Sequence, residues 1–287
     1  MKLLRFALIL TVVACSAPAL AWEAAGHTTV TEHALQLLPK EMKPFYEANS
    51  RYIVAFCTLP DDWRDSHKAE IAYRHFIDLD LLSKPPFADL RVDKATAEQR
   101  FGKEQLQKAG TLPWAIGEQY NKLVRAMRSG DSVGIALQSA ILAHLVADAH
   151  VPMHNTQLYD GRTPDEKGIH NRWEATLLLD RLKPGMVNAC EPAKVGPVLP
   201  SAFDWCIESY SKCNQIFDAD DAARKLDPTF GYKYETSMWT STGPLMIDQL
   251  DHASERLAGT WISAWNDAGK PELPAKVAPF LWEKSEL

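Results

Sequence analysis

Stretches in which apolar and polar residues alternate are scarce in this chain of 287 residues, so few segments can form half-buried β-strands. Internal repeats and low-complexity linkers are missing as well, which favours one domain over a string of modules. We therefore predict an all-α fold with a single compact multi-helix domain over residues 22–287. Helices are expected at 28–38, 41–56, 104–127 (with a break near Pro113 left open), 131–149, 170–182, 202–217, 219–226 and 245–268, whereas 227–243 is expected to be irregular.

An excess of basic residues is also missing. Without Lys2 and Arg5, which belong to the leader described below, the 31 basic residues become 29 against 37 acidic ones, a net charge of −8. This balance argues against the broad basic surface that proteins binding duplex nucleic acid carry. An anionic substrate would therefore need a local positive field.

The N-terminus has the pattern of a secretory signal peptide over residues 1–21. Lys2 and Arg5 precede an apolar run that is too short to span a bilayer, and a small-x-small cleavage site ends at Ala21. Cleavage there makes Trp22 the mature N-terminus, and the alternative is an uncleaved anchor. We find no later stretch long and apolar enough to span a membrane, so we expect a secreted or periplasmic protein with no membrane anchor after cleavage.

Paired CxxC motifs are absent, which disfavours a cysteine-based zinc site. Four cysteines follow the leader, and an even number in an exported protein predicts two disulfides. If residues 202–216 are helical, Cys206 and Cys213 lie roughly 10 Å apart along the axis, too far for a direct bond. We therefore expect each of them to pair with Cys57 or Cys190, with the connectivity left open.

The stretch HLVADAHVPMH contains three histidines and an aspartate. His144 and Asp148 are four residues apart and share one face of a helix. Pro152 weakens the helix directly afterwards, so His154 can turn back toward the same point. Imidazole nitrogens and a carboxylate on one face are typical zinc ligands. We assign His150 no ligand role and expect it to be a supporting or surface residue.

Further candidate ligands occur at four other places. Taken singly, an aspartate before a tryptophan can cap a helix, and a His–Glu pair four apart can be a surface pair. Taken together, eight side chains are too many for one tetrahedral ion and suit two or three. Calcium and magnesium prefer oxygen ligands, so the mixed set favours zinc. The eight candidates are His27, Asp61, His75, His144, Asp148, His154, His170 and Glu174.

These residues stand in ordered motifs: W-x-x-x-G-H, P-D-x-x-R, H-F-x-D, H-x-x-x-D-x-x-x-P-x-H and H-x-x-x-W-E. In these motifs the chain resembles the S1/P1-type nucleases, trinuclear zinc enzymes of a superfamily that includes bacterial phosphatidylcholine-type phospholipase C. The resemblance implies three zinc ions in a helical fold. It implies Asp61, His75 and His144 for one ion, His27 with the amine and carbonyl of Trp22 for a second, Asp148 as the bridge between these two, and His154, His170 and Glu174 for the third.

The resemblance also implies the reaction. A water activated at the pair bridged by Asp148, with Asp61 also in the catalytic set, would hydrolyse phosphodiesters of RNA and single-stranded DNA, and duplex more slowly. The products would carry 5′-phosphates, and 3′-nucleotidase activity is expected. Arg64 would bind phosphate, while Phe76 would stack on a base that Asp78 contacts; alternatively, Arg64 is a surface residue and Phe76 a core residue.

Two other functions remain open from the sequence. The related phospholipases have Glu where the nucleases usually have Asp, so Glu174 favours a phospholipase C acting on phosphatidylcholine to a small extent. A non-catalytic zinc-binding protein would need closed coordination shells, which the ligand count does not favour. We expect the nuclease, acting as a monomer on single-stranded nucleic acid and nucleotides.

Overall fold

The computed structural model describes residues 22–66 and 71–274. Within these ranges the chain forms helices and no strand, apart from one isolated β-bridge between Ile77 and Gly110, so the all-α prediction is confirmed. The predicted signal peptide lies outside the described residues. The elements are α1 (Glu23–Gln36), α2 (Lys43–Phe56), α3 (Leu59–Ser66), η1 (Ala72–Arg74), α5 (Leu79–Leu82), η2 (Ala88–Leu90), α6 (Lys94–Phe101), α7 (Lys103–Ala109), α8 (Leu112–Ser129), α9 (Ser132–Ala149), η3 (Pro152–Asn155), η4 (Pro164–Glu166), α10 (Ile169–Asn171), the π-helical η5 (Arg172–Leu177), α11 (Leu178–Arg181), α12 (Val198–Tyr210), α13 (Cys213–Leu226) and α14 (Tyr232–Asp267).

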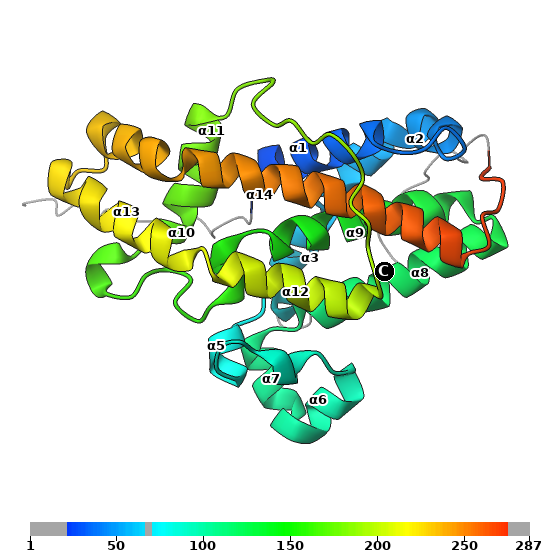
Figure 1. The fold of residues 1–287 in the computed structure, drawn as a ribbon, viewed down its shortest axis with the longest axis horizontal. Coiled ribbons are helices and arrows are strands. Elements are labelled where there is room, and N and C mark those ends of the chain that lie inside the picture. The colour runs from blue at the N-terminus through cyan, green and yellow to red at the C-terminus, as the bar shows by residue number, and fades with distance from the viewer. Residues whose placement is uncertain (1–21, 67–70, 275–287) are drawn as a thin grey trace, which may run out of the picture.

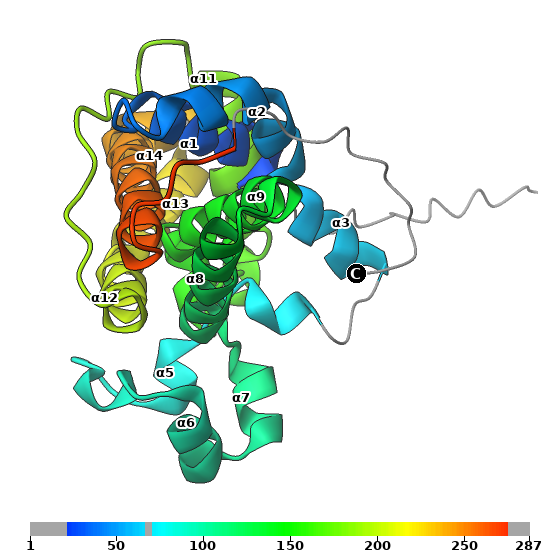
Figure 2. The same ribbon diagram turned by 90° about the vertical axis from the view of Figure 1, so that its right-hand side faces the viewer.

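Helices α8 and α9 form an antiparallel hairpin at the centre of the molecule (Figure 2). Gly130 ends α8 with a left-handed conformation (φ 68°), and the side chain of Asp131 caps α9 by accepting a hydrogen bond from the N–H of Gly134. Helices α1, α2 and α14 pack around α9, while α13 lies beside α14 and α12 packs against α8 (Figure 1). The hairpin therefore holds the middle of the core.

Helix α9 is apolar and mostly buried. By length and composition Ser132–Ala149 could cross a membrane, which corrects the expectation that no stretch after the leader would reach that length and hydropathy. The helix carries buried His144 and Asp148 and is covered by its neighbours, so here it serves as a core helix.

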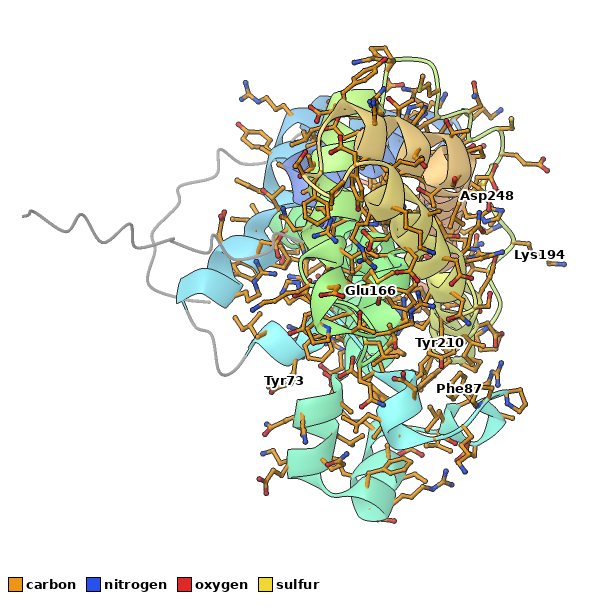
Figure 3. All side chains as sticks on the ribbon, turned by 90° about the vertical axis from the view of Figure 1, so that its left-hand side faces the viewer. Tyr73, Phe87, Glu166, Lys194, Tyr210 and Asp248 are labelled. Atoms are coloured by element: carbon orange, nitrogen blue, oxygen red, sulfur yellow. The ribbon has the colours of Figure 1, made fainter. Side chains whose placement is uncertain are left out.

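Helices α5, α6 and α7 form an arm that lies below the main body in Figures 1 and 2. At its base Phe87 packs edge-on against Tyr210 of α12, with ring centroids 5.0 Å apart (Figure 3). The arm follows directly on the segment 75–78, so this contact helps to fix that segment against the body.

Several helix boundaries differ from the prediction. The expected helix over 202–217 ends at Tyr210 and the next begins at Cys213, so Cys206 and Cys213 lie on separate helices, α12 and α13, and not on one. Residues 232–243 are not irregular but form the start of α14, which continues through Pro244. Tyr234 and Met238 are buried there, and tertiary packing outweighs the low helix propensity of Gly243 and Pro244. The expected helix over 104–127 is divided at Gly110 rather than at Pro113, since proline fits the first turn of α8.

The two expected disulfides are not formed in this structure. All four cysteines are free; the thiol of Cys57 contacts the carbonyl oxygen of Val54 at 3.0 Å and that of Cys213 contacts the carbonyl oxygen of Pro152 at 3.2 Å. The disulfide prediction is therefore not confirmed.

Candidate active site

Asp148 lies at the meeting point of four histidines that come from separate parts of the chain. Its carboxylate oxygens are 3.2 Å from Nδ1 of His75 and 3.2 Å from Nε2 of His144. They are 3.7 Å from Nε2 of His27 on α1 and 3.6 Å from Nδ1 of His154 in η3. The predicted helix face and the predicted return of His154 after the proline are both present, with all five side chains buried.

Asp61 on α3 joins the same cluster. Its Oδ1 is 3.7 Å from Nδ1 of His75 and 3.8 Å from Nε2 of His144. Two overlapping groups of ligand atoms are close enough to share an ion, and His144 belongs to both: His27, Asp61 and His144 form one group, and His75, His144 and Asp148 form the other.

A third group consists of His154, His170 and Glu174, as the resemblance implies. Nε2 of His170 is 2.9 Å from Oε1 of Glu174, and Nε2 of His154 is 3.6 Å from Oε2. His170 and Glu174 are four residues apart, which places both on one face of the α10–η5 segment. All eight predicted side chains therefore gather at one place.

Trp22 begins the first helix beside this cluster. Its indole N–H donates to the carbonyl oxygen of Ala147 at 3.0 Å, and its ring packs against Trp173. A Cβ on Gly26 would lie 2.9 Å from the Trp22 side chain, so only glycine fits at that position of the W-x-x-x-G-H motif. The proposed role of the Trp22 amine stays a prediction.

Burial favours the neutral form of three of the candidate ligand histidines. It lowers the pKa of His170 to about 4, lowers the pKa of His154, and holds the pKa of His27 well below its usual value. A neutral imidazole is the form that binds a metal ion. His144 differs, because the carboxylates of Asp148 and Asp61 outweigh its burial and raise its pKa to about 9.

The carboxylates show that the cluster suits a cation. Burial, together with nearby Asp148, raises the pKa of Glu174 to about 8. Burial also opposes ionisation of Asp148, but the positive charge of His144 outweighs it and holds the pKa of Asp148 well below its usual range. All four carboxylate oxygens of Asp148 and Glu174 are buried without a hydrogen-bond partner among the described residues. Metal ions would satisfy these oxygens.

Backbone carbonyls orient two of the histidine rings. Nδ1 of His144 is 2.8 Å from the carbonyl oxygen of Cys57, and Nδ1 of His154 is 2.8 Å from that of His75. This leaves Nε2 of each ring directed at the cluster, the arrangement that fixes a metal-binding tautomer. The N–H of Ile77 donates in turn to the carbonyl oxygen of His154 at 2.8 Å. The segment 75–77 and η3 are therefore joined by hydrogen bonds in both directions.

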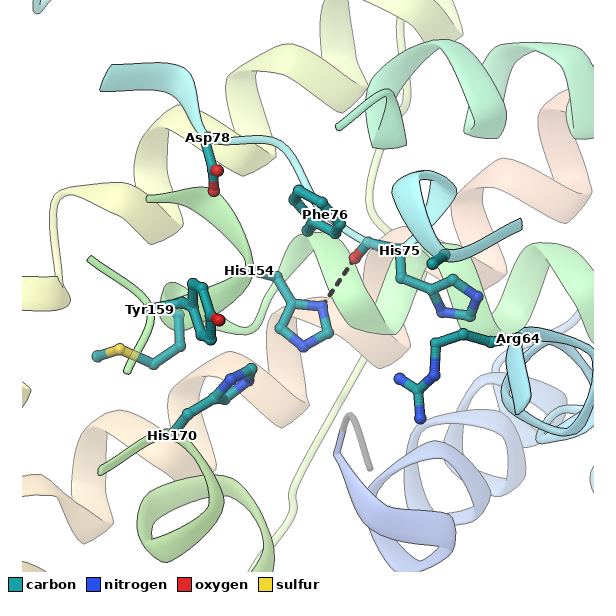
Figure 4. Close-up of a pocket in the computed structure, with 9 residues that line it drawn as sticks. Arg64, His75, Phe76, Asp78, His154, Tyr159 and His170 are labelled. Atoms are coloured by element: carbon teal, nitrogen blue, oxygen red, sulfur yellow. Dashed lines mark hydrogen bonds between the residues drawn. The ribbon is translucent and has the colours of Figure 1, made fainter. Parts of the chain in front are cut away.

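A pocket of about 220 Å³ opens beside the ligands. Figure 4 shows Tyr159 at one end and Arg64 at the other, with His154 between them. The residues that line it are Arg64, Ala72, His75, Phe76, Asp78, Met153, His154, Tyr159 and His170. The three predicted substrate contacts, Arg64, Phe76 and Asp78, thus all face one space.

The comparison with protein families decides the identity of the chain. The sequence model described as S1/P1 Nuclease matches residues 22–175, more than half of the 287 residues. The chain belongs to the S1/P1 nuclease family. No curated protein matches it.

Family membership makes this S1/P1 nuclease a hydrolase that acts on phosphodiester bonds of nucleic acids, and the family is metal-dependent. The matched range contains every predicted ligand. Helices α12, α13 and α14 lie outside it. What these helices contribute to the site is therefore inferred from the structure of this chain.

Sequence reasoning missed Tyr159 and Met153 as pocket residues. Met153 fills a variable position of the P-x-H motif, and Tyr159 stands in no motif, although it is half exposed and packs edge-on against His170, with ring centroids 5.7 Å apart. The ring of His150 does not contact the ligand cluster through its nitrogens. Its Nδ1 is 2.7 Å from the carbonyl oxygen of Val146, and its Nε2 is 3.0 Å from a guanidinium nitrogen of Arg256 on α14.

Replacing Gly110 by Ala in this S1/P1 nuclease is expected to destabilise the fold by about 3 kcal/mol. A Cβ there would lie 2.1 Å from the carbonyl oxygen of Phe76, and Gly110 has φ +86°. Denaturant unfolding of the two proteins measures the effect. The matched change is Gly102→Ala, where φ is also positive but no atom lies within 4 Å. Equal losses from both changes would contradict the steric argument.

Proposed function

We propose that this chain is an exported, zinc-dependent endonuclease for RNA and single-stranded DNA. It acts more slowly on duplex, leaves 5′-phosphate ends and also has 3′-nucleotidase activity. The mature protein is one domain, residues 22–287, which works as a monomer with three zinc ions. The observation that carries the proposal is the convergence of eight candidate ligand side chains, seven of them buried, beside a pocket lined by an arginine, an aromatic residue and an aspartate.

The donor set favours zinc, since five imidazoles and three carboxylates suit it better than calcium or magnesium. Asp61, Asp148 and Glu174 contribute −3, so three zinc ions leave the centre at about +3 before any anion binds. This local field supplies the attraction that a mature chain with a net charge of −8 otherwise lacks. Zinc ions of this kind supply an ionised water near neutral pH and neutralise charge on phosphate.

Arg64 is suited to bind phosphate. Its side chain is mostly buried, one guanidinium nitrogen lies 3.2 Å from Oδ1 of Asp61, and it lines the pocket next to His75. A guanidinium stays charged and presents parallel donors that match phosphate oxygens. Asp61 holds it in place, so a phosphate bound here would lie directly beside the ligand cluster.

Phe76 and Asp78 are suited to bind a base. Both are partly buried and line the pocket, and burial together with the nearby charge of Asp80 raises the pKa of Asp78 to about 7. An aromatic face accepts any base by stacking, and a base can stack there only when it is unpaired. This favours single-stranded substrates over duplex.

The Phe76→Ala variant is expected to raise KM for single-stranded DNA by roughly 10-fold, since stacking on one base contributes about 1–3 kcal/mol. Its zinc content should stay at the wild-type value, because Phe76 supplies no ligand. Steady-state kinetics and metal analysis measure the two quantities. An unchanged KM would show that Phe76 does not contribute to base binding.

The N-terminus gives a second prediction. An α-amino group can bind zinc only when it is free, and amine and carbonyl oxygen of one residue form a five-membered chelate ring. The carbonyl oxygen of Trp22 already accepts the first helical hydrogen bond, from the N–H of Gly26 at 2.9 Å, which fixes its position. One extra residue before Trp22 should therefore lower zinc content by about one ion and activity by at least about 10-fold. Full zinc content and activity in the extended protein would contradict this role.

The test of the proposed function compares one oligonucleotide, single-stranded and annealed, with the zinc-loaded protein. We expect faster cleavage of the single strand and internal fragments with 5′-phosphate ends. Equal rates on both forms, or 5′-hydroxyl ends, would overturn the proposal.

A phospholipase C acting on phosphatidylcholine is the alternative. The observation in its favour is Glu174, which takes the place of the aspartate usual in the nucleases. Arg64, Phe76 and Asp78 in one pocket favour the nuclease, since a base and a phosphate are what they match.

A further inference from the structure

The third ligand cluster depends on a short irregular segment. Helix η4 is followed by Gly168, which has φ +86°, then by α10 and the π-helical η5. His170 and Glu174 lie on this segment, and Glu174 is in the first turn of η5. π-Helical turns are rare and need support from their surroundings. The position of both ligands is therefore set by whatever holds residues 166–174.

His170 has little support of its own. The rings of His144 and His154 are each held by a backbone carbonyl oxygen, at 2.8 Å in both cases. Both ring nitrogens of His170 are buried without a hydrogen-bond partner in the described part of the chain. Its Nε2 lies 2.9 Å from Oε1 of Glu174, which belongs to the same cluster. The direction of the His170 ring therefore depends on its backbone.

The guanidinium of Arg172 links the backbone on the N-terminal side of His170 to residue 172 by hydrogen bonds. It donates to the carbonyl oxygen of Lys167 at 2.7 Å and to that of Glu166 at 3.1 Å. A Cβ on Gly168 would lie 2.8 Å from the same guanidinium. The absence of a side chain at Gly168 therefore leaves room for the Arg172 side chain. One side chain thus ties the start of the ligand segment to its middle, with His170 between the two.

Two residues from the C-terminal helices fix Arg172 in turn. Asp220 on α13 is fully buried and accepts from Arg172 at 3.0 Å and from Arg224 at 2.6 Å. Tyr234 on α14 accepts from Nε of Arg172 at 3.0 Å and donates to Asp220 at 2.5 Å. A carboxylate with three donors at a buried position holds a fixed geometry.

Glu166 adds a second link to α13. Glu166, labelled in Figure 3, is buried. Its carboxylate accepts from the side chain of Arg162 at 2.7 Å, and Arg162 also pairs with Asp218 and Asp221. The segment that carries the third cluster is therefore held against α13 at two points. Helices α13 and α14 lie outside residues 22–175, the range that matches the family.

We infer that Asp220 and Tyr234 are positioning residues for the third metal site, which act through Arg172 on His170 and Glu174. The inference rests on the proposed function, since it assumes that these ligands hold zinc. It predicts that the C-terminal helices of this chain are needed for the metal centre although they contribute no ligand.

The experiment measures zinc release by a graded chelator from the full-length mature protein. In Asp220→Asn and in Tyr234→Phe we expect one ion to be released at about 10-fold lower chelator concentration, with the other ions unchanged. Tyr234→Phe keeps the ring and removes only the hydroxyl, so it decides the question if Asp220→Asn fails to fold. Glu235→Gln is the matched control, because Glu235 pairs with Arg181 at 3.4 Å between α11 and α14 without contacting the ligand segment.

A general structural role would lower the melting temperature and weaken all the ions together. That result, or wild-type release curves for Asp220→Asn and Tyr234→Phe, would overturn the inference while the wild type still binds zinc and cleaves single strands. If the wild type itself bound no zinc, the proposed function would fail first.

Discussion

The Asp148→Asn variant is expected to lose about 10³-fold or more in kcat on single-stranded DNA, together with zinc. Asp148 lies within 3.7 Å of four candidate ligand histidines, and its two oxygens are buried with no hydrogen-bond partner among residues 22–66 and 71–274. An amide has nearly the same shape but no charge, and it cannot bridge two ions through two equivalent oxygens. Single-turnover kinetics and metal analysis on the purified variant measure both effects.

The matched control is Asp180→Asn on the exposed face of α11, which should leave activity and zinc content unchanged. Wild-type zinc content in Asp148→Asn, with kcat within about 10-fold of the wild type, would show that Asp148 does not bridge the metal ions.

Removal of zinc is expected to abolish activity and to lower stability. The centre buries Asp61, Asp148 and Glu174 among histidines, and the raised pKa of Glu174 shows that this environment opposes a free carboxylate. Tightly bound zinc stabilises the folded state by at least about 4 kcal/mol when it is present at 1,000 times its Kd. For a protein of this size that corresponds to a fall in Tm of about 10 °C on chelation.

Differential scanning calorimetry with and without a chelator measures the fall in Tm. Zinc should restore both Tm and activity, whereas magnesium should restore neither, since it prefers oxygen ligands. An unchanged Tm after complete zinc removal would contradict a buried trinuclear centre.

Local spacing was enough to predict much of the site. His144 with Asp148, and His170 with Glu174, each repeat at four residues, so helical geometry alone places each pair on one face. Pro152 marked the end of α9 and thereby the return of His154. These inferences need only the backbone preferences of a few neighbouring residues.

Long-range contacts could not be predicted in this way. Local spacing alone does not place His27 and Asp61 in one group with His144, because their approach depends on how α1, α3 and α9 pack. The link from Arg172 to Asp220 spans 48 residues and belongs to no motif. The start of α14 at Tyr232 was missed for the same reason, since burial against other helices stabilises it.

The most direct measurement presents the zinc-loaded protein with single-stranded DNA, RNA and phosphatidylcholine side by side, at equal enzyme concentration. We predict rapid hydrolysis of both nucleic acids and none of the lipid. Hydrolysis of phosphatidylcholine alone would contradict the account.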